Sequence, residues 1–183
     1  MFISRKLREE NIASYLLYMW HTEDIIRAYS CSLSRIRSEY ISRFDYTEEQ
    51  CAELADWYGN LITMMNREGC REQGHLAINN IVLQEMSELH VRLLQSTKFP
   101  VYNAEYYRAL PFIVELRQRG AAKDGSETET CLTALYGVMM LRLAKKDVTP
   151  STEHAAKEIA TLMSMLSDYY KRSRTEDLFA DND

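Results

Sequence analysis

Hydrophobic residues recur along most of this chain with the spacing of an amphipathic α-helix. The clearest run extends from His75 to Thr97 and places its apolar side chains on one broad face: Leu76, Ile78, Val82, Leu83, Met86, Leu89, Leu93 and Leu94. A helix over this run would be roughly 35 Å long, and so wide an apolar face needs several neighbouring helices to cover it. The pattern therefore predicts an all-α fold, a single-domain bundle of about six to seven helices around a long central helix, His75 to Thr97.

The same period predicts helices elsewhere, at about residues 4–29, 30–45, 47–69, 103–116, 126–144 and 149–171. Local signals mark several of their ends. Thr47 and Ser126 each open a capping box, in which two side chains satisfy free backbone N–H groups at a helix start. Gly69 is a natural helix stop, and Pro150 fits the first helical position after Thr149. With only 6 Gly and 3 Pro in the chain, long helices joined by short turns are expected.

Three places interrupt this pattern. Pro111 lies inside an apolar stripe and should kink its helix or split it in two, because the proline ring displaces the carbonyl four residues earlier. The stretch GAAKDGSE, residues 120–127, is the most loop-like part of the chain and is expected to be a mobile connection. We expect one helical domain over residues 1–172, followed by an acidic, frayed C-terminal tail over residues 173–183.

Composition narrows the class of protein. The 183 residues are 46% hydrophobic and carry 22 basic against 27 acidic side chains, a net charge of −5 without a basic cluster, which disfavours binding to nucleic acid. No apolar run is long enough for a signal peptide or a membrane span. A cytoplasmic protein with no membrane association is therefore expected. The cysteines lack CxxC spacing, which favours reduced structural thiols over a zinc site: Cys31, Cys51, Cys70 and Cys131.

Two charged residues stand in the middle of an apolar face. Glu23 and Arg27 lie four residues apart on the first predicted helix, among side chains that the pattern assigns to the core. An unpaired charge there would cost several kcal/mol. The two must therefore pair with each other, find other partners or line a solvated cavity, and we expect both to be mostly buried and hydrogen-bonded.

The predicted central helix also carries polar residues on its apolar face. Asn79 and His90 fall inside that arc, about three turns apart. A core histidine that is satisfied by hydrogen bonds is the favoured interpretation of His90. In the alternative, Asn79 and His90 converge with Glu23 and Arg27 on a buried polar pocket that binds a small molecule.

The run EENIASYLLYMWHTEDIIRAY, which begins at Glu9, resembles an uncharacterised family of small bacterial proteins. That family is described as a domain of unknown function and is found mainly in the Bacteroides group. The resemblance is firmest over the first thirty residues and continues more loosely, in length and helical pattern, over the remainder. It implies an all-α, cytoplasmic bacterial protein and carries over no catalytic residue and no activity.

Motifs for catalysis are sparse. A carboxylate-bridged di-metal site needs two Glu-x-x-His pairs and two further glutamates, whereas only Glu72 and His75 have this spacing. The chain has no Gly-rich phosphate loop and no nucleophile motif. A carboxylate-bridged metalloenzyme is therefore a remote alternative, and we predict no catalytic residues, no metal site and no cofactor.

The helix predicted after Ser126 carries a separate stripe of small residues: Thr130, Thr133, Gly137 and Ala144. Such small side chains allow close approach, so we expect this stripe to abut another helix, within the chain or across a two-fold dimer, with packing inside the chain favoured. Together with the lack of catalytic motifs, this favours a non-enzymatic helical protein that acts by association with itself or with a protein partner. The small-molecule-binding bundle, with a regulatory role, is the alternative.

Overall fold

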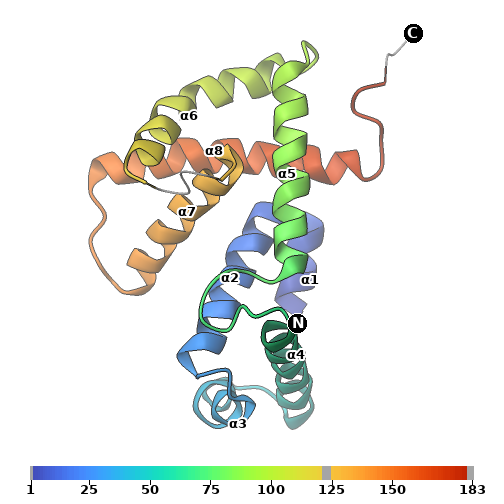
Figure 1. Cartoon of the computed structure of the whole chain (residues 1–183), viewed down its shortest axis with the longest axis vertical. Coiled ribbons are helices and arrows are strands. Elements are labelled where there is room, and N and C mark those ends of the chain that lie inside the picture. The colour runs from blue at the N-terminus through green and yellow to red at the C-terminus, as the bar shows by residue number, and fades with distance from the viewer. Residues whose placement is uncertain (1, 121–124, 181–183) are drawn as a thin grey trace.

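The protein folds as a single all-α domain in the computed structural model, which describes residues 2–120 and 125–180. Every regular element in that part of the chain is helical (Figure 1). The elements in order are α1 (Phe2–Glu10), α2 (Ile12–Ala28), α3 (Leu33–Arg35), the π turn η1 (Ile36–Tyr40), the 3₁₀ turn η2 (Ile41–Arg43), α4 (Glu48–Arg67), α5 (Ala77–Gln95), α6 (Pro100–Gln118), α7 (Glu127–Leu143) and α8 (Pro150–Ser173). The predicted fold class is confirmed.

The helices form two groups that α2 joins. Helices α1 to α4 make one end of the elongated molecule, and α5 to α8 make the other, with α8 crossing its neighbours (Figure 1). Helix α2 packs against α1 and α4 in the first group and against α5, α7 and α8 in the second. The site described below lies on α2 at this junction.

The predicted central helix begins at Ala77 and ends at Gln95, so both ends are two residues shorter than expected. It packs against α2, α6, α7 and α8, which agrees with its broad apolar face. Nine of the 17 residues of α2 are buried, compared with six of the 19 in α5. The more deeply buried helix is therefore α2.

The single helix expected over residues 4–29 is two helices in the structure. Asn11 adopts an extended conformation, with φ −151° and ψ 103°, and its side chain accepts a hydrogen bond from Ser14 N at 2.8 Å. An asparagine in this geometry is an N-cap, because its side chain satisfies a backbone N–H that has no partner inside the new helix. The apolar period continued through Asn11, and for that reason the pattern concealed the break.

The other helix starts and stops follow the local signals. Thr47 and Gln50 form the complete capping box, Ser126 accepts from the backbone of Glu129, and Thr149 caps α8 ahead of Pro150. Gly69 follows α4 with φ +71°, a conformation that glycine adopts without strain.

Pro111 neither ends nor splits its helix. Helix α6 continues across it and follows an arc in Figure 1. Pro111 and Tyr107, whose carbonyl loses its helical hydrogen bond, both face solvent. Water can satisfy that carbonyl, so the helix does not have to break there. Helix α6 also starts at Pro100, three residues before the start predicted at Asn103.

The segment after α8 folds back onto the domain. Phe179 packs edge-to-face on Phe99, and the Arg92 guanidinium lies 4.0 Å from the centroid of the Phe179 ring. Lys98 Nζ donates to the carbonyl of Ala180 at 2.8 Å. A frayed tail is therefore the wrong description of residues 174–180. The rest of the predicted tail, residues 181–183, and the core of the predicted mobile connection, residues 121–124, lie outside the described residues.

Within the described ranges, no helix has both the length and the apolar character that crossing a membrane requires.

The Asn11 cap predicts a specific stability effect. Asn11→Ala should lower the free energy of unfolding by about 1 kcal/mol, because Ser14 N–H loses its acceptor. Asn11→Ser should retain most of that stability, because a serine hydroxyl also caps a helix. Urea unfolding followed by circular dichroism measures both. An equal loss in the two variants would contradict a capping role.

Candidate functional site

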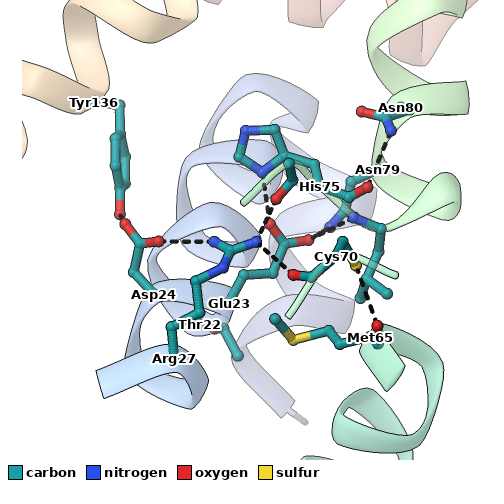
Figure 2. A network of polar contacts seen from close by, with 12 residues as sticks. Thr22, Glu23, Asp24, Arg27, Met65, Cys70, His75, Asn79, Asn80 and Tyr136 are labelled. Atoms are coloured by element: carbon teal, nitrogen blue, oxygen red, sulfur yellow. Dashed lines mark hydrogen bonds and ion pairs between the residues drawn. The ribbon is translucent and has the colours of Figure 1, made fainter. Parts of the chain in front are cut away.

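The candidate site is built around the carboxylate of Glu23 on α2, which is fully buried with 0% exposure. Its Oε1 accepts hydrogen bonds from Leu76 N at 3.1 Å and from Asn79 Nδ2 at 2.7 Å. Its Oε2 lies 2.6 Å from His75 Nδ1, which donates because a carboxylate only accepts. Tyr15 in turn donates to Asn79 Oδ1 at 3.3 Å. The charge in the apolar face is thus satisfied by three donors (Figure 2).

These donors lie in the first turn of α5 and in the two residues before it. Leu76 is the N-cap of that helix, and its apolar side chain cannot accept a capping hydrogen bond. The Glu23 carboxylate on α2 accepts from Leu76 N, and Glu68 Oε2 accepts from Ala77 N at 2.7 Å. A helix N-terminus carries partial positive charge and unpaired N–H groups, so carboxylates stabilise it. Glu23 therefore fixes the start of α5 against α2.

Arg27 has partners other than Glu23. Its Nη1 donates to Asp24 Oδ1 at 2.8 Å, and its Nη2 donates to the carbonyls of Cys70, at 3.0 Å, and Gly74. The side chain is only 17% exposed. The expectation that both charges are mostly buried and hydrogen-bonded is confirmed, but they do not pair with each other. The four-residue spacing permitted a pair, whereas the connection between α4 and α5 supplies better-placed acceptors for Arg27 and donors for Glu23.

Aromatic rings cover the outer side of this network. Trp20 stacks on the His75 ring with centroids 4.4 Å apart, and Tyr136 meets Trp20 edge-on. The Tyr136 hydroxyl donates to Asp24, which ties α7 to the same cluster (Figure 2). Sequence reasoning missed His75 as the partner of Glu23 because the two residues are 52 positions apart and only the fold brings them together.

The Glu23 network is closed to a ligand at its centre. The carboxylate has no exposed surface, and its donors come from within the chain. His75 is the outermost member, with 32% of its side chain exposed. The geometry therefore serves to dock helices. Exchanging Glu23 contacts for those of a ligand would require α5 to move.

His90 belongs to a second polar cluster, far from Glu23. Its Nδ1 lies 2.6 Å from the Tyr102 hydroxyl and its Nε2 lies 3.4 Å from Glu127 Oε2, while Tyr106 donates to the other Glu127 oxygen at 3.3 Å. One tautomer satisfies every contact: Nε2–H donates to Glu127 and Nδ1 accepts from Tyr102. The hydrogen bond from His90 holds the pKa of Glu127 below its usual range.

His90 is therefore a buried, hydrogen-bonded core histidine, as the favoured interpretation held. The predicted convergence of four residues on one pocket is wrong in this respect. Glu23 and Asn79 touch, and Arg27 lies beside them (Figure 2). His90 is 11 residues, or about 16 Å, beyond Asn79 along α5.

The small-residue stripe on α7 is mostly uncovered. Thr130 is buried, but Thr133, Gly137 and Ala144 are exposed, and a Cβ added to Gly137 would meet no atom within 4 Å. The favoured prediction, packing against a helix of the same chain, is wrong for these three residues. Helix α7 packs on α2, α5, α6 and α8. Its buried residues are instead Thr128, Thr130, Cys131, Leu132 and Val138.

The Glu72-x-x-His75 spacing does not place two metal ligands on one helix face, because both residues lie in the connection between α4 and α5. His75 Nδ1 is already bonded to Glu23. Among the residues that the structure describes, no three His, Cys, Asp or Glu side chains are grouped so that they could hold a metal ion.

The thiols are all unpaired in the structure. Cys70 and Cys131 are buried, and burial raises the pKa of the Cys131 thiol to about 12. A thiol with so high a pKa is a poor nucleophile near neutral pH. Cys131 therefore packs as a small apolar side chain.

The chain belongs to the family described as Domain of unknown function (DUF4924), whose model matches residues 1–177. The resemblance seen in the run from Glu9 is thus confirmed over nearly the whole chain. No curated protein and no solved structure matches the chain. Membership of this family brings no activity with it, so function has to be argued from geometry.

Glu23→Gln should lower the free energy of unfolding by about 2–3 kcal/mol, because a neutral amide cannot replace a carboxylate that accepts three buried hydrogen bonds. Glu39→Gln is the matched control, since Glu39 pairs with Arg35 on the surface, and it should leave stability nearly unchanged. Chemical denaturation of the three proteins measures the difference. Equal stability of the Glu23 variant and the wild type would show that the network does not hold α5 in place.

Burial raises the pKa of Tyr106 and of Tyr170 to about 12, and raises those of Tyr15 and Tyr102 as well. The folded state therefore favours the neutral phenols. Their contribution to stability is complete below about pH 10, the pKa of an unfolded tyrosine, and is lost as pH rises toward 12. Urea midpoints should fall over that window, and absorbance at 295 nm should show that buried tyrosines ionise only on unfolding. Ionisation of all 12 tyrosines near pH 10 with intact helices would contradict this.

Proposed function

We propose that this DUF4924 protein acts by self-association, through an open groove bounded by α2, α7 and α8. The observation that carries the proposal is the groove itself, which has a volume of about 890 Å³. Apolar side chains from the three helices make up most of its wall: Ala13, Leu17, Leu135, Val138, Met139, Ala156, Ala160 and Met163. Along α8 it extends from Glu153 to Ser164, which is about 16 Å or three helical turns.

The groove is exposed at its end. Leu143, in the last turn of α7, lines it and is 57% exposed. An apolar surface that several helices share and that stays open to water favours association, because covering it releases ordered water. A helix-lined groove of this kind suits a partner that presents a helix with an apolar face.

The rim of the groove favours a second copy of this chain as the occupant. Arg142 and Glu153 form an ion pair at the rim, and Lys157 lies beside them. A rim that carries both signs of charge is self-complementary across a two-fold axis, since each copy offers an acid to the base of the other. A partner whose surface carries charge of mainly one sign would not be electrostatically complementary to this mixed rim.

A small-molecule site beside Glu23 and Arg27 is the competing proposal, and it has less support. Hydrogen bonds within the chain already occupy the Glu23 carboxylate, and Arg27 already donates to Asp24 and to two backbone carbonyls. A ligand there would have to displace these contacts.

Self-association predicts a concentration-dependent dimer in analytical ultracentrifugation. Leu143→Arg should weaken dimerisation about tenfold or more, because it places a charge in the apolar contact. Ala160→Arg, at an exposed position in the same groove, should act likewise. Val101→Arg is the control, because Val101 is 63% exposed on α6 and does not line the groove.

A wild-type protein that stays monomeric at high concentration would contradict the proposal. So would a dimer that all three arginine variants weaken equally. Circular dichroism melting of each variant separates loss of association from loss of fold, because the substituted side chains of Leu143, Ala160 and Val101 are solvent-exposed in the single chain.

A further inference from the structure

A second cavity, with a volume of about 220 Å³, lies where α1, α2, η1 and α4 meet. Five aromatic rings form most of its wall: Tyr18, Tyr40, Phe44, Tyr46 and Tyr58. Ligand sites for drug-sized molecules are about 300–1,000 Å³. This cavity therefore suits a compact group, such as the head of a larger molecule.

The rings are set at steep angles to one another. Tyr40 meets Phe44 at 79° with centroids 5.2 Å apart, and it meets Tyr58 at 83° with centroids 6.0 Å apart. Phe44 continues into Tyr46 as a stacked pair at 5.3 Å. These contacts hold the rings to one another, and together the five rings line the cavity on several sides. The π face of an aromatic ring is its negative side.

Two of these rings expose a large apolar surface to water. Phe44 is 39% exposed and Tyr46 is 44% exposed, although both are large and apolar enough to pack in the core. The deeper rings are more constrained: Tyr58 is buried, and burial raises its pKa above the usual range, so its phenol stays neutral. The cavity is thus an open box whose floor is fixed and whose outer walls reach solvent.

The one charged side chain among the described residues that line the box is acidic. Glu53 lines the cavity and has no ion-pair partner within the described residues. The segment from Asp45 to Glu53 carries four acidic residues and no basic one. Arg43, the nearest basic residue in sequence, does not line the cavity. A carboxylate at the mouth of an aromatic box attracts a cation and gives an anion no partner.

We propose that this cavity binds an organic cation through a quaternary or methylated ammonium head, which the rings surround and Glu53 neutralises. Such a head group is large, weakly hydrated and spread over methyl groups, so it gains from several π faces at once. The same head occurs on free small molecules and on trimethylated lysine side chains. This binding role is separate from the groove between α2, α7 and α8.

Isothermal titration calorimetry of the full chain with tetramethylammonium and choline tests the proposal, with sodium chloride added to match ionic strength. The matched probe is 3,3-dimethyl-1-butanol, which has the shape of choline without its charge. Both cations should bind saturably, and the neutral probe should bind about tenfold more weakly or not at all. A peptide that carries trimethyl-lysine forms the second arm. Tighter binding of the peptide than of choline identifies a protein-borne head, and the reverse order identifies a small molecule.

Variants assign the binding to this cavity. Tyr46→Leu removes an aromatic ring from the outer wall and should weaken binding of the cations about fivefold to tenfold. Tyr46→Phe keeps the ring, and its affinity for the cations should stay within about twofold of that of the wild type. Glu53→Gln should weaken binding of the cations and leave the affinity for the neutral probe unchanged. Tyr107→Leu, at a 68% exposed tyrosine on α6, is the control and should bind like the wild type.

Circular dichroism checks that each variant is folded. Equal binding of choline and its neutral analogue, or cation binding that Tyr46→Leu and Glu53→Gln leave intact, would overturn the assignment. The absence of saturable binding by the folded wild type would overturn it too.

Discussion

The position of α5 relative to α2 depends on one buried carboxylate. Helix α5 begins without a capping side chain of its own, and the Glu23 carboxylate supplies an acceptor from across the helix junction. The arrangement satisfies two needs at once, because an apolar face cannot hold a bare charge and a helix start cannot be buried with free N–H groups. Helix α2 packs on both groups of helices, so the fixed joint at Glu23 sets how these groups are oriented.

The sequence predicted the fold well wherever apolar period and capping chemistry agreed. Thr47, Gly69 and Thr149 mark their helix ends correctly because capping depends on residues within one turn. Asn11 shows the limit of this reasoning: the apolar stripe continues across it, and only its backbone geometry reveals the break. Pro111 shows the opposite limit, because the expected break does not occur where the freed carbonyl faces solvent.

The candidate site was predictable only in part. The apolar surroundings of Glu23 and Arg27 correctly required that both be satisfied, but helical spacing pointed to the wrong partners. Contacts between α2 and residues 70–79 depend on how the connection before α5 folds, and no local pattern encodes that path. His90 was placed correctly in the core and incorrectly near Glu23. Its cluster with Tyr102 also requires the docking of α6, which the sequence does not specify.

The buried polar groups and the open apolar surfaces of this protein therefore play different parts. Glu23 and His90 have their partners within the chain, and such closed networks hold helices in register. The groove and the aromatic cavity are open surfaces, and each uses α2, through Leu17 in the groove and Tyr18 in the cavity. These neighbouring residues point about 100° apart around the helix. A shift of α2 that altered one surface would therefore alter the other, and any resulting coupling would by linkage act equally in both directions.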